Sequence, residues 1–329
     1  MVPDPVARPM HERSVPDSRS DLEPIADLRV TPEMTVRELL DGMYRGGGFS
    51  AKKVAIGAEI FNKMASEDVT TILSFPACLM ATGVRGVLAG MVKDGLVDAI
   101  ITTCGTLDHD LARLWRHYYQ GSFQMDDVKL HQLGINRLGN VLVPNESYGE
   151  ILEEKLQPWI REMYAQKKEW STAEICREFG RRIAELPNRE ESLLYWCYER
   201  NVPIYVPGPT DGSVGSQFWM FYQNHRDFRF DLLKDEQDLS DLTFKAKQLG
   251  ALMLGGGISK HHTIWWSQFR DGLDYAIYIT TAVEYDGSLS GARLEEAISW
   301  GKIKEDARII NIEGDVSVIL PLLYAAALG

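Results

Sequence analysis

Short apolar runs alternate with longer amphipathic segments along most of this 329-residue chain. The runs are rich in Val, Ile and Leu, which predicts buried strands. These strands are expected at 70–75, 98–103, 203–206, 251–254, 275–281 and 309–312, with a short extended segment at 141–143. Apolar residues that recur every three or four positions predict helices. These helices are expected at 31–45, 50–65, 79–93, 107–119, 148–168, 172–184, 192–201, 240–248 and 316–328, with another after residue 257.

Strands that alternate with helices of this length predict an α/β fold, in which a parallel sheet carries helices on both faces. Ligands of such sheets bind outside the carboxyl ends of the strands. Glycine-rich or polar segments follow predicted strands at 75–78, 102–105, 209–213, 255–257 and 280–282. We therefore expect the functional site at this edge of the sheet.

The chain divides into an N-terminal arm and one domain. Residues 1–25 carry prolines at positions 3, 5, 9, 16 and 24, which is typical of a mobile arm. Residues 26–329 show no internal repeat and no shift of composition, so we expect a single catalytic domain there.

Composition and charge narrow the class of protein. The chain is 45% hydrophobic and carries a net charge of −12, which argues against a nucleic-acid or anionic-membrane partner. An acidic chain instead suits a small cationic ligand or a basic protein partner. The sequence has neither a transmembrane segment nor a secretory signal, so we expect a cytoplasmic protein.

The cysteines predict neither a metal site nor a redox motif. Cys78, Cys104, Cys176 and Cys197 contain no CxxC pair, which excludes a zinc ribbon or a thioredoxin motif. We expect no bound metal, and we expect most of these cysteines to be reduced packing residues.

Two patterns after the predicted strand at 251–254 could carry chemistry. Gly255, Gly256 and Gly257 let backbone amides approach a phosphate or ribose, although they could equally form a tight turn alone. His261 and His262 are adjacent, so on a helix they point about 100° apart and form a poor metal pair. One of them could be a general base, or both could be ordinary surface or core residues.

A third pattern places Glu296, Trp300 and Lys302 close together. A tryptophan face can hold an amine cation while a carboxylate binds its other end. Burial beside an aromatic ring disfavours a lysine's charged form and makes that lysine a candidate nucleophile. The alternative is that Lys302 is one more solvated lysine.

Five segments together resemble the deoxyhypusine synthase family. They are GGGISKHH at 255–262, TTAVEYDGSLSGARLEEAISWGKI at 280–303, ITTCGTLDHDLAR at 101–113, GINRLGNVLVPNESY at 134–148 and PTDGSVG at 209–215. The similarity covers about residues 30–328. It implies a Rossmann-like NAD-binding fold and a homotetramer built as a dimer of dimers, with active sites at the dimer interface.

The resemblance also implies roles for individual residues. Lys302 matches the nucleophile, and His261 the residue that assists proton transfer. Trp300 matches the ring stacked on the polyamine, and Glu296 the carboxylate that holds an amine. Further substrate positions are Asp108, His109, Ser216, Gly287, Ser288 and Leu289. Positions for NAD are Ala77, Cys78, Ala81, Thr103, Cys104, Gly105, Asp211, Gly256, Thr281, Ala282, Asp286, Ser290 and Asp315.

The chain departs from the eukaryotic pattern of this family at several of these positions. Leu289 and Ser216 stand where that pattern has aspartates that help bind amines, and each lost charge-assisted contact is worth about 1.5–3 kcal/mol. A glutamate pair of the family reads Asp108-His109 here, and a cofactor-facing asparagine reads Cys78. Asp108, His109 or Glu284 could restore part of the amine recognition.

The resemblance implies that the chain transfers the aminobutyl group of spermidine, through an imine on Lys302, to one lysine of translation factor 5A. The acidic charge agrees, because that lysine lies on a basic loop. An alternative within the family is a homospermidine synthase-like enzyme with putrescine as acceptor. A non-catalytic NAD-binding scaffold and a plain NAD dehydrogenase are alternatives of other classes.

Overall fold

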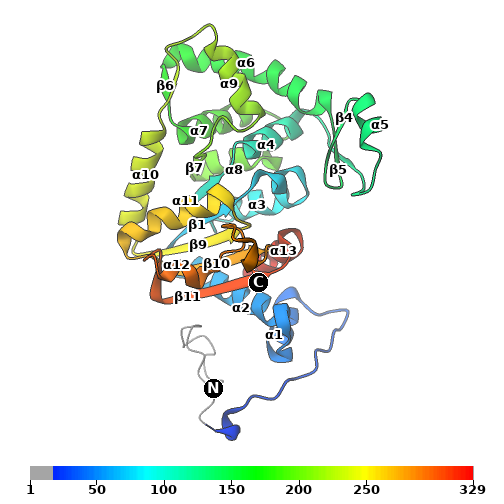
Figure 1. The fold of residues 1–329 in the computed structure, drawn as a ribbon, viewed down its shortest axis with the longest axis vertical. Coiled ribbons are helices and arrows are strands. Elements are labelled where there is room, and N and C mark those ends of the chain that lie inside the picture. Colours follow the sequence, from blue (N-terminus) through cyan, green and yellow to red (C-terminus); the bar gives the residue numbers. More distant parts are fainter. Residues whose placement is uncertain (1–17, 329) are drawn as a thin grey trace. The chain divides into compact units, whose positions relative to one another are not determined.

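A computed structural model describes residues 18–328, which group into two compact units (Figure 1). Unit one comprises residues 18–74 and 241–328, and unit two comprises residues 75–240. The single domain expected at 26–329 stays a prediction. Most of the predicted N-terminal arm, residues 1–17, lies outside the described residues. Its remainder contains one short 3-10 turn, Arg19–Asp21, and no regular structure up to residue 25.

Four parallel strands form the centre of unit one, in the order β11-β10-β9-β1. Their bounds are Val69–Phe75 for β1, Gln248–Leu254 for β9, Leu273–Thr280 for β10 and Ile303–Glu313 for β11. Ile277 of β10 lies between Leu252 and Ile310 of its two neighbours. Strands β1, β9 and β10 and the 309–312 part of β11 are almost entirely buried, because a parallel sheet is covered on both of its faces.

Helices cover both faces of this sheet. On one face, Gly57 of α2 (Phe49–Ser66) approaches β11 so closely that a Cβ atom there would lie 2.6 Å from Ile312. Helix α13 (Val316–Leu328) packs beside α2. Asn311 points to the opposite face, since side chains alternate along a strand, and its carboxamide oxygen accepts from the Leu294 amide at the start of α12 (Leu294–Ile298). The α/β fold with helices on both faces is thereby confirmed.

The remaining helices of unit one frame this sheet. Helix α1 spans Val36–Gly46, and α11 spans Gly257–Ser267 directly after β9. Thr35 and Glu38 form a reciprocal capping box at the start of α1, so this helix begins five residues later than the sequence predicts.

Unit two contains one pair of parallel strands, two small sheets and a set of helices. The parallel pair is β2 (Ala99–Thr102) with β7 (Ile204–Tyr205), and β6 (Glu169–Trp170) pairs with β8 (Arg229–Phe230). The antiparallel sheet contains β3 (Tyr119–Gln120), β4 (Ile135–Leu138) and β5 (Val141–Pro144), beside α5 (Asp127–Gln132). The larger helices are α3 (Val84–Lys93), α4 (Gly105–Trp115), α6 (Gly149–Gln166), α7 (Thr172–Ile183), α8 (Leu193–Arg200) and α9 (Ser213–Tyr222). Helix α10 (Leu232–Lys245) crosses the boundary between the units.

Several predicted elements are wrong in extent. The helix expected at 79–93 is broken into a 3-10 turn, Ala77–Ala81, and α3. The break lies at Thr82, because its hydroxyl donates to the Leu79 carbonyl and accepts from the Val84 amide. The helix expected at 107–119 ends at residue 115. The helix expected at 240–248 begins at 232, where Asp231 accepts from the Lys234 amide in the manner of a cap. Helix α9 and strands β3 and β4 were not predicted.

None of the four cysteines forms a disulfide, and Cys104, Cys176 and Cys197 are buried, as predicted for most of them. Cys78 is exposed. No helix within residues 18–328 combines the length and the apolar character that crossing a bilayer requires.

Candidate active site

The predicted site residues fall into two groups, one in each unit. Unit one holds the predicted nucleophile and base, together with the 286–293 loop between β10 and α12. Unit two holds the segments that follow β2 and β7.

Lys302 is buried, which excludes the reading of a solvated surface lysine. The residue is 8% exposed and lies in the tight turn between α12 and β11, where Gly301 adopts a positive φ of 67°. Its backbone carbonyl accepts from the Ser267 hydroxyl at 2.7 Å and from the Leu273 amide at 3.1 Å. Its Nζ lies 5.3 Å from the ring centre of Trp300 and 5.7 Å from that of Trp265. The amine therefore has an aromatic environment, as the sequence predicts for a nucleophile.

Trp300 lies near this amine, and Glu296 is exposed at the surface of unit one. Trp300 is 68% exposed, and Glu296 belongs to the first turn of α12. The structure brings the indole and the amine together, whereas the place of the Glu296 carboxylate beside them stays a prediction. Trp265 completes the aromatic surroundings and was not predicted; the signal that could have found it is its position four residues after His261 on one helix.

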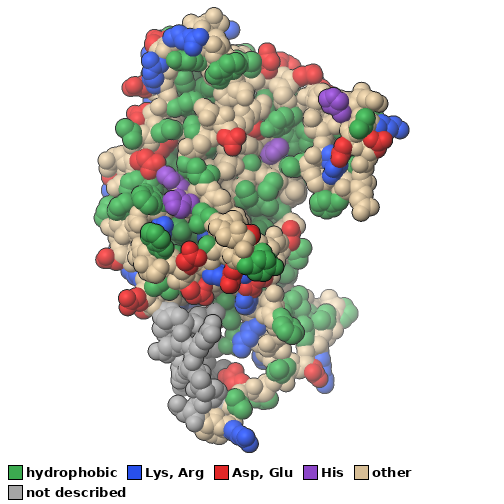
Figure 2. All heavy atoms as spheres, viewed as in Figure 1, with side chains coloured by type: hydrophobic (Ala, Val, Ile, Leu, Met, Phe, Trp, Pro, Cys, Tyr) green, Lys and Arg blue, Asp and Glu red, His purple; other side chains and the backbone are tan. Residues whose placement is uncertain are grey.

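His261 lies half-buried on α11, beside the same aromatic ring. Its imidazole stacks on Trp265 with ring centroids 5.8 Å apart. Burial lowers the pKa of His261, and the positive charge of Lys302 lowers it further. A neutral imidazole can accept a proton, so this geometry suits the predicted base. Figure 2 shows histidine side chains at the surface over α11, with acidic and hydrophobic side chains around them.

Lys260 holds the 286–293 loop from inside unit one. Its side chain is only 1% exposed, and Nζ donates to the carbonyls of Leu289 at 3.0 Å and Ala292 at 2.6 Å. The same ammonium lies 3.7 Å from the ring centre of Tyr278. Burial lowers the pKa of Lys260 to about 8. The sequence predicts no role for this lysine, because a helix pattern alone does not show which lysine points inward.

The loop is also fixed to β10 and to the glycine turn. The Ser290 carbonyl accepts from the Tyr278 hydroxyl at 2.5 Å and from the Thr280 hydroxyl at 3.1 Å. A Cβ atom at Gly256 would lie 2.2 Å from the Ser290 hydroxyl oxygen, so only glycine fits there. Asp286 accepts from the Ser288 amide at 2.7 Å, and Gly287 follows with a φ of 69°. The predicted residues of this loop, Leu289 among them, therefore lie in one ordered segment.

The turn from β9 into α11 suits a dinucleotide. Gly255 and Gly257 have positive φ angles of 72° and 76°, and no atom lies within 4 Å of a Cβ built at Gly257. The open space leaves the first backbone amides of α11 accessible to a phosphate or ribose. Thr281, Ala282 and Asp315 follow the carboxyl ends of β10 and β11, which is the ligand-binding edge of a parallel sheet.

In unit two, the predicted residues surround the start of α4. The Thr103 hydroxyl accepts from the Ala77 amide at 3.1 Å, which places Ala77, Cys78 and Ala81 beside Thr103, Cys104 and Gly105. The Cys104 thiol donates to the Pro209 carbonyl at 3.1 Å, and burial raises its pKa to about 12. This thiol is therefore protonated and holds the segment that contains Asp211.

Asp108 and His109 occupy different surroundings. Asp108 is fully buried, and Tyr148 donates to its carboxylate at 2.5 Å. His109 is half-buried, with its Nδ1 atom 3.0 Å from the Tyr118 hydroxyl oxygen. Burial and the nearby Arg113 lower the pKa of His109 to about 4, so its ring is neutral at pH 7. Ser216 is exposed on α9 and donates to the Gly212 carbonyl at 3.1 Å.

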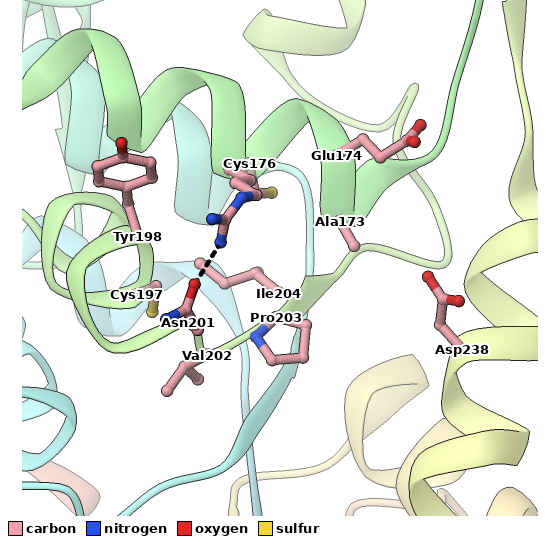
Figure 3. A pocket seen from close by; sticks show the side chains of 11 residues that line it. Ala173, Glu174, Cys176, Cys197, Tyr198, Asn201, Val202, Pro203, Ile204 and Asp238 are labelled. Carbon is pink, nitrogen blue, oxygen red and sulfur yellow. Dashed lines mark hydrogen bonds between the residues drawn. The ribbon is translucent and has the colours of Figure 1, made fainter.

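A small cavity of about 180 Å³ lies elsewhere in unit two, against α7 and α8 (Figure 3). Glu174 and Asp238 line one part of it, and Arg177 donates to Asn201 at 2.8 Å in another. None of the predicted site residues lines this cavity. Among residues 18–328, no three His, Cys, Asp or Glu side chains gather in a way that could hold a metal ion.

Comparison with known proteins decides the family. The deoxyhypusine synthase family matches residues 38–327, which is most of the chain. This chain belongs to the deoxyhypusine synthase family. Its resemblance to that family is thereby confirmed, and membership implies an enzyme of the transferase class.

Individual relatives support the assignment of this chain to the deoxyhypusine synthase family. The probable deoxyhypusine synthase of Picrophilus torridus is 58% identical over 303 residues, which cover 92% of this chain and 96% of that protein. The probable deoxyhypusine synthase of Thermoplasma acidophilum is 57% identical over 302 residues, which also cover 92% of this chain and 96% of that protein. A crystal structure of an Entamoeba histolytica protein described as a deoxyhypusine synthase has a TM-score of 0.64 at 19% identity, covering 89% of this chain and 93% of that one. That last likeness shows a shared fold.

Proposed function

We propose that this chain is a deoxyhypusine synthase that uses NAD and spermidine and forms an imine on Lys302. The observation that carries the proposal is the buried Lys302 amine beside Trp265 and Trp300, with His261 of α11 stacked on Trp265. A solvated lysine would be poorly suited to this chemistry, because water stabilises its charged form.

Oxidation of the polyamine would convert one amine-bearing methylene carbon into an imine carbon. Lys302 would attack this carbon. The new bond to Nζ forms as 1,3-diaminopropane leaves, so the four-carbon aminobutyl group stays on the enzyme as an imine. An acceptor amine then attacks the same carbon and releases Lys302. Lys302 is itself only 8% exposed, and this burial would limit the access of water to the imine, which would otherwise hydrolyse.

His261 would move the protons of these exchanges. Each attack by an amine requires that a proton leave nitrogen, and a neutral imidazole is a suitable acceptor. Its stacking on Trp265 fixes the plane of the ring. Because its lowered pKa keeps it neutral at pH 7, His261 does not repel a cationic substrate.

The polyamine would lie against aromatic and acidic side chains. The exposed face of Trp300 suits a methylene chain between two cationic nitrogens, and Glu296 suits a terminal ammonium. We infer that these contacts, with Glu284 of the adjoining loop, replace some of the charge that Leu289 and Ser216 do not supply.

The residues present fit NAD. In unit one these are the glycine turn at 255–257 together with Thr281, Ala282, Asp286, Ser290 and Asp315. In unit two these are Ala77, Cys78, Ala81, Thr103, Gly105 and Asp211. Bound NAD would supply a hydride acceptor at the start of the cycle and the matching donor at its end, so that the net reaction is group transfer. A structure of AgrE in complex with ornithine and NAD+ has a TM-score of 0.52 at 15% identity, which is a likeness of fold.

The acceptor proposed is one lysine of translation factor 5A, and the assembly proposed is a homotetramer in the cytoplasm. The family name supports the protein acceptor. Putrescine is the second candidate, because Leu289 and Ser216 lack the carboxylates that the eukaryotic pattern uses to bind amines.

A competition experiment distinguishes the two acceptors. The enzyme is incubated with NAD and spermidine labelled in its butyl part, with factor 5A and putrescine both present. Label on factor 5A supports deoxyhypusine synthesis, whereas label on putrescine alone shows a homospermidine-forming enzyme. Free NADH with no transferred label would show a dehydrogenase and overturn the proposal.

A further inference from the structure

Asp108 is a buried carboxylate whose bonds join three separate segments of unit two. It lies in the first turn of α4 and is 0% exposed. The sequence suggests amine binding for this position, yet a fully buried carboxylate without contact to solvent is poorly placed to receive a cation. Its hydrogen bonds show what it contacts instead.

Three neutral donors bind the two oxygens of Asp108. Oδ1 accepts from the Val214 amide at 2.7 Å, while Oδ2 accepts from the Ser213 amide at 2.8 Å. Oδ2 also accepts from the Tyr148 hydroxyl at 2.5 Å. Ser213 and Val214 are the first two residues of α9, so a carboxylate from α4 occupies the place of a helix cap.

The segment before α9 is packed tightly against the same carboxylate. We call residues 209–212 the 209–212 loop; it contains Asp211 and leads from β7 to α9. A Cβ atom at Gly212 would lie 2.8 Å from Asp108 Oδ2 and 2.9 Å from Cys104 Sγ. The Cys104 thiol donates to the Pro209 carbonyl at the other end of the loop. Two residues of one segment, Cys104 and Asp108, therefore hold both ends of this loop.

Burial raises the pKa of Asp108, and the three donors act in the opposite direction. All three donors stabilise the ionised form, and no amine is needed to do so. Tyr148 extends the network to the start of α6, next to the antiparallel sheet.

We propose that Asp108 is a positioning residue that fixes the 209–212 loop and the start of α9, and that it does not contact the substrate. This arrangement sets the position of Asp211, which lies in the 209–212 loop. The consequence for cofactor affinity rests on the proposed function, which assigns Asp211 to NAD. The arrangement itself is a property of unit two alone.

The test compares Asp108→Asn and Tyr148→Phe with wild type. An asparagine amide nitrogen cannot accept the bonds that Oδ2 accepts, and phenylalanine removes only the hydroxyl donor. Tyr164→Phe is the matched control, because the Tyr164 hydroxyl also donates to an aspartate, Asp227, at 2.6 Å but at an exposed site. Backbone hydrogen exchange is followed in peptides that cover 209–216, and NAD affinity and the KM values of both substrates are measured.

Exchange at 209–216 should accelerate about tenfold or more in Asp108→Asn, since a lost bond to a charged group is worth roughly that factor. Tyr148→Phe should show a smaller increase, and Tyr164→Phe none. NAD affinity should fall most in Asp108→Asn, less in Tyr148→Phe and not at all in Tyr164→Phe, while the KM for polyamine changes less.

Unchanged exchange in both variants overturns the proposal, as does a raised polyamine KM with unchanged NAD affinity. If Asp108→Asn does not fold, Tyr148→Phe decides. Wild-type protein that binds no NAD would overturn the proposed function instead, and the exchange measurement would still test the arrangement.

Discussion

At the scale of single residues, the aromatic rings around Lys302 account for much of the proposed chemistry. Trp300 is mostly exposed, whereas Trp265 lies on α11 with His261 stacked against it. The sequence identifies Trp300 through its motif and does not identify Trp265, because the packing of α11 brings that ring to the amine. The roles of Lys302, His261, Glu296 and Trp300 remain predictions that the following experiments test.

Trp300→Ala should weaken polyamine affinity by about two- to thirtyfold, the range expected for a lost cation–π contact. The thermal unfolding temperature should hardly change, because the side chain is 68% exposed and contributes little to the core. Trp219→Ala, at 63% exposure in unit two, is the control and should leave affinity unchanged. Equal polyamine affinity in Trp300→Ala and wild type would remove Trp300 from the site.

The lowered pKa of Lys260 predicts that the stability of the protein depends on pH. Its pKa is about 8 in the fold and 10.5 when unfolded, so below pH 8 the fold bears the full cost of a buried charge. That cost disappears as pH rises through this window, which corresponds to a gain of up to roughly 3 kcal/mol at 1.36 kcal/mol per pKa unit. The free energy of unfolding should therefore rise from pH 7.5 to 10.5 in wild type relative to Lys260→Met. Parallel curves for the two proteins would contradict this account of Lys260.

At the scale of elements, close contacts between helices depend on single glycines. Gly180 lies where α7 meets α8, and a Cβ atom there would be 2.4 Å from the Leu194 carbonyl oxygen and 2.6 Å from Tyr198 Cβ. Gly86 lies on α3 with no atom within 4 Å of the same position. The two glycines therefore offer a matched pair within unit two.

Gly180→Ala should destabilise the protein by about 1–3 kcal/mol, because α8 must move to admit the methyl group. Gly86→Ala should stabilise it by up to about 1 kcal/mol, because alanine favours a helix over glycine. Urea unfolding followed by circular dichroism measures both. A Gly180→Ala protein as stable as Gly86→Ala would show that α7 and α8 are not in close contact.

The elements that could be predicted are those whose signals are local. Strands β1, β9 and β10 contain short apolar runs, and the glycines at 46–48 mark the end of α1. Helix α9 was missed because its cap is Asp108, more than a hundred residues earlier in the chain. Strands β4 and β5 enclose Gly139 and Asn140, a short hairpin signal that was available in the sequence.

At the scale of the whole molecule, family membership and the parallel α/β fold were predicted correctly from the motifs and the strand–helix alternation. Burial could not be predicted in the same way. The inward direction of Lys260, the isolation of Asp108 from solvent and the ordering of the 286–293 loop all result from packing between segments distant in sequence. These are the features that change the interpretation of individual site residues.

The central claim is that Lys302 carries the aminobutyl group during transfer. The most direct measurement incubates the enzyme with NAD and butyl-labelled spermidine without an acceptor, reduces the mixture with borohydride and locates the label by mass spectrometry. We expect the label on Lys302 in wild type and in the surface control Lys245→Ala. Lys302→Ala should retain NAD affinity, carry no label and transfer nothing. Label on another residue, or transfer to an acceptor by Lys302→Ala, would contradict the account.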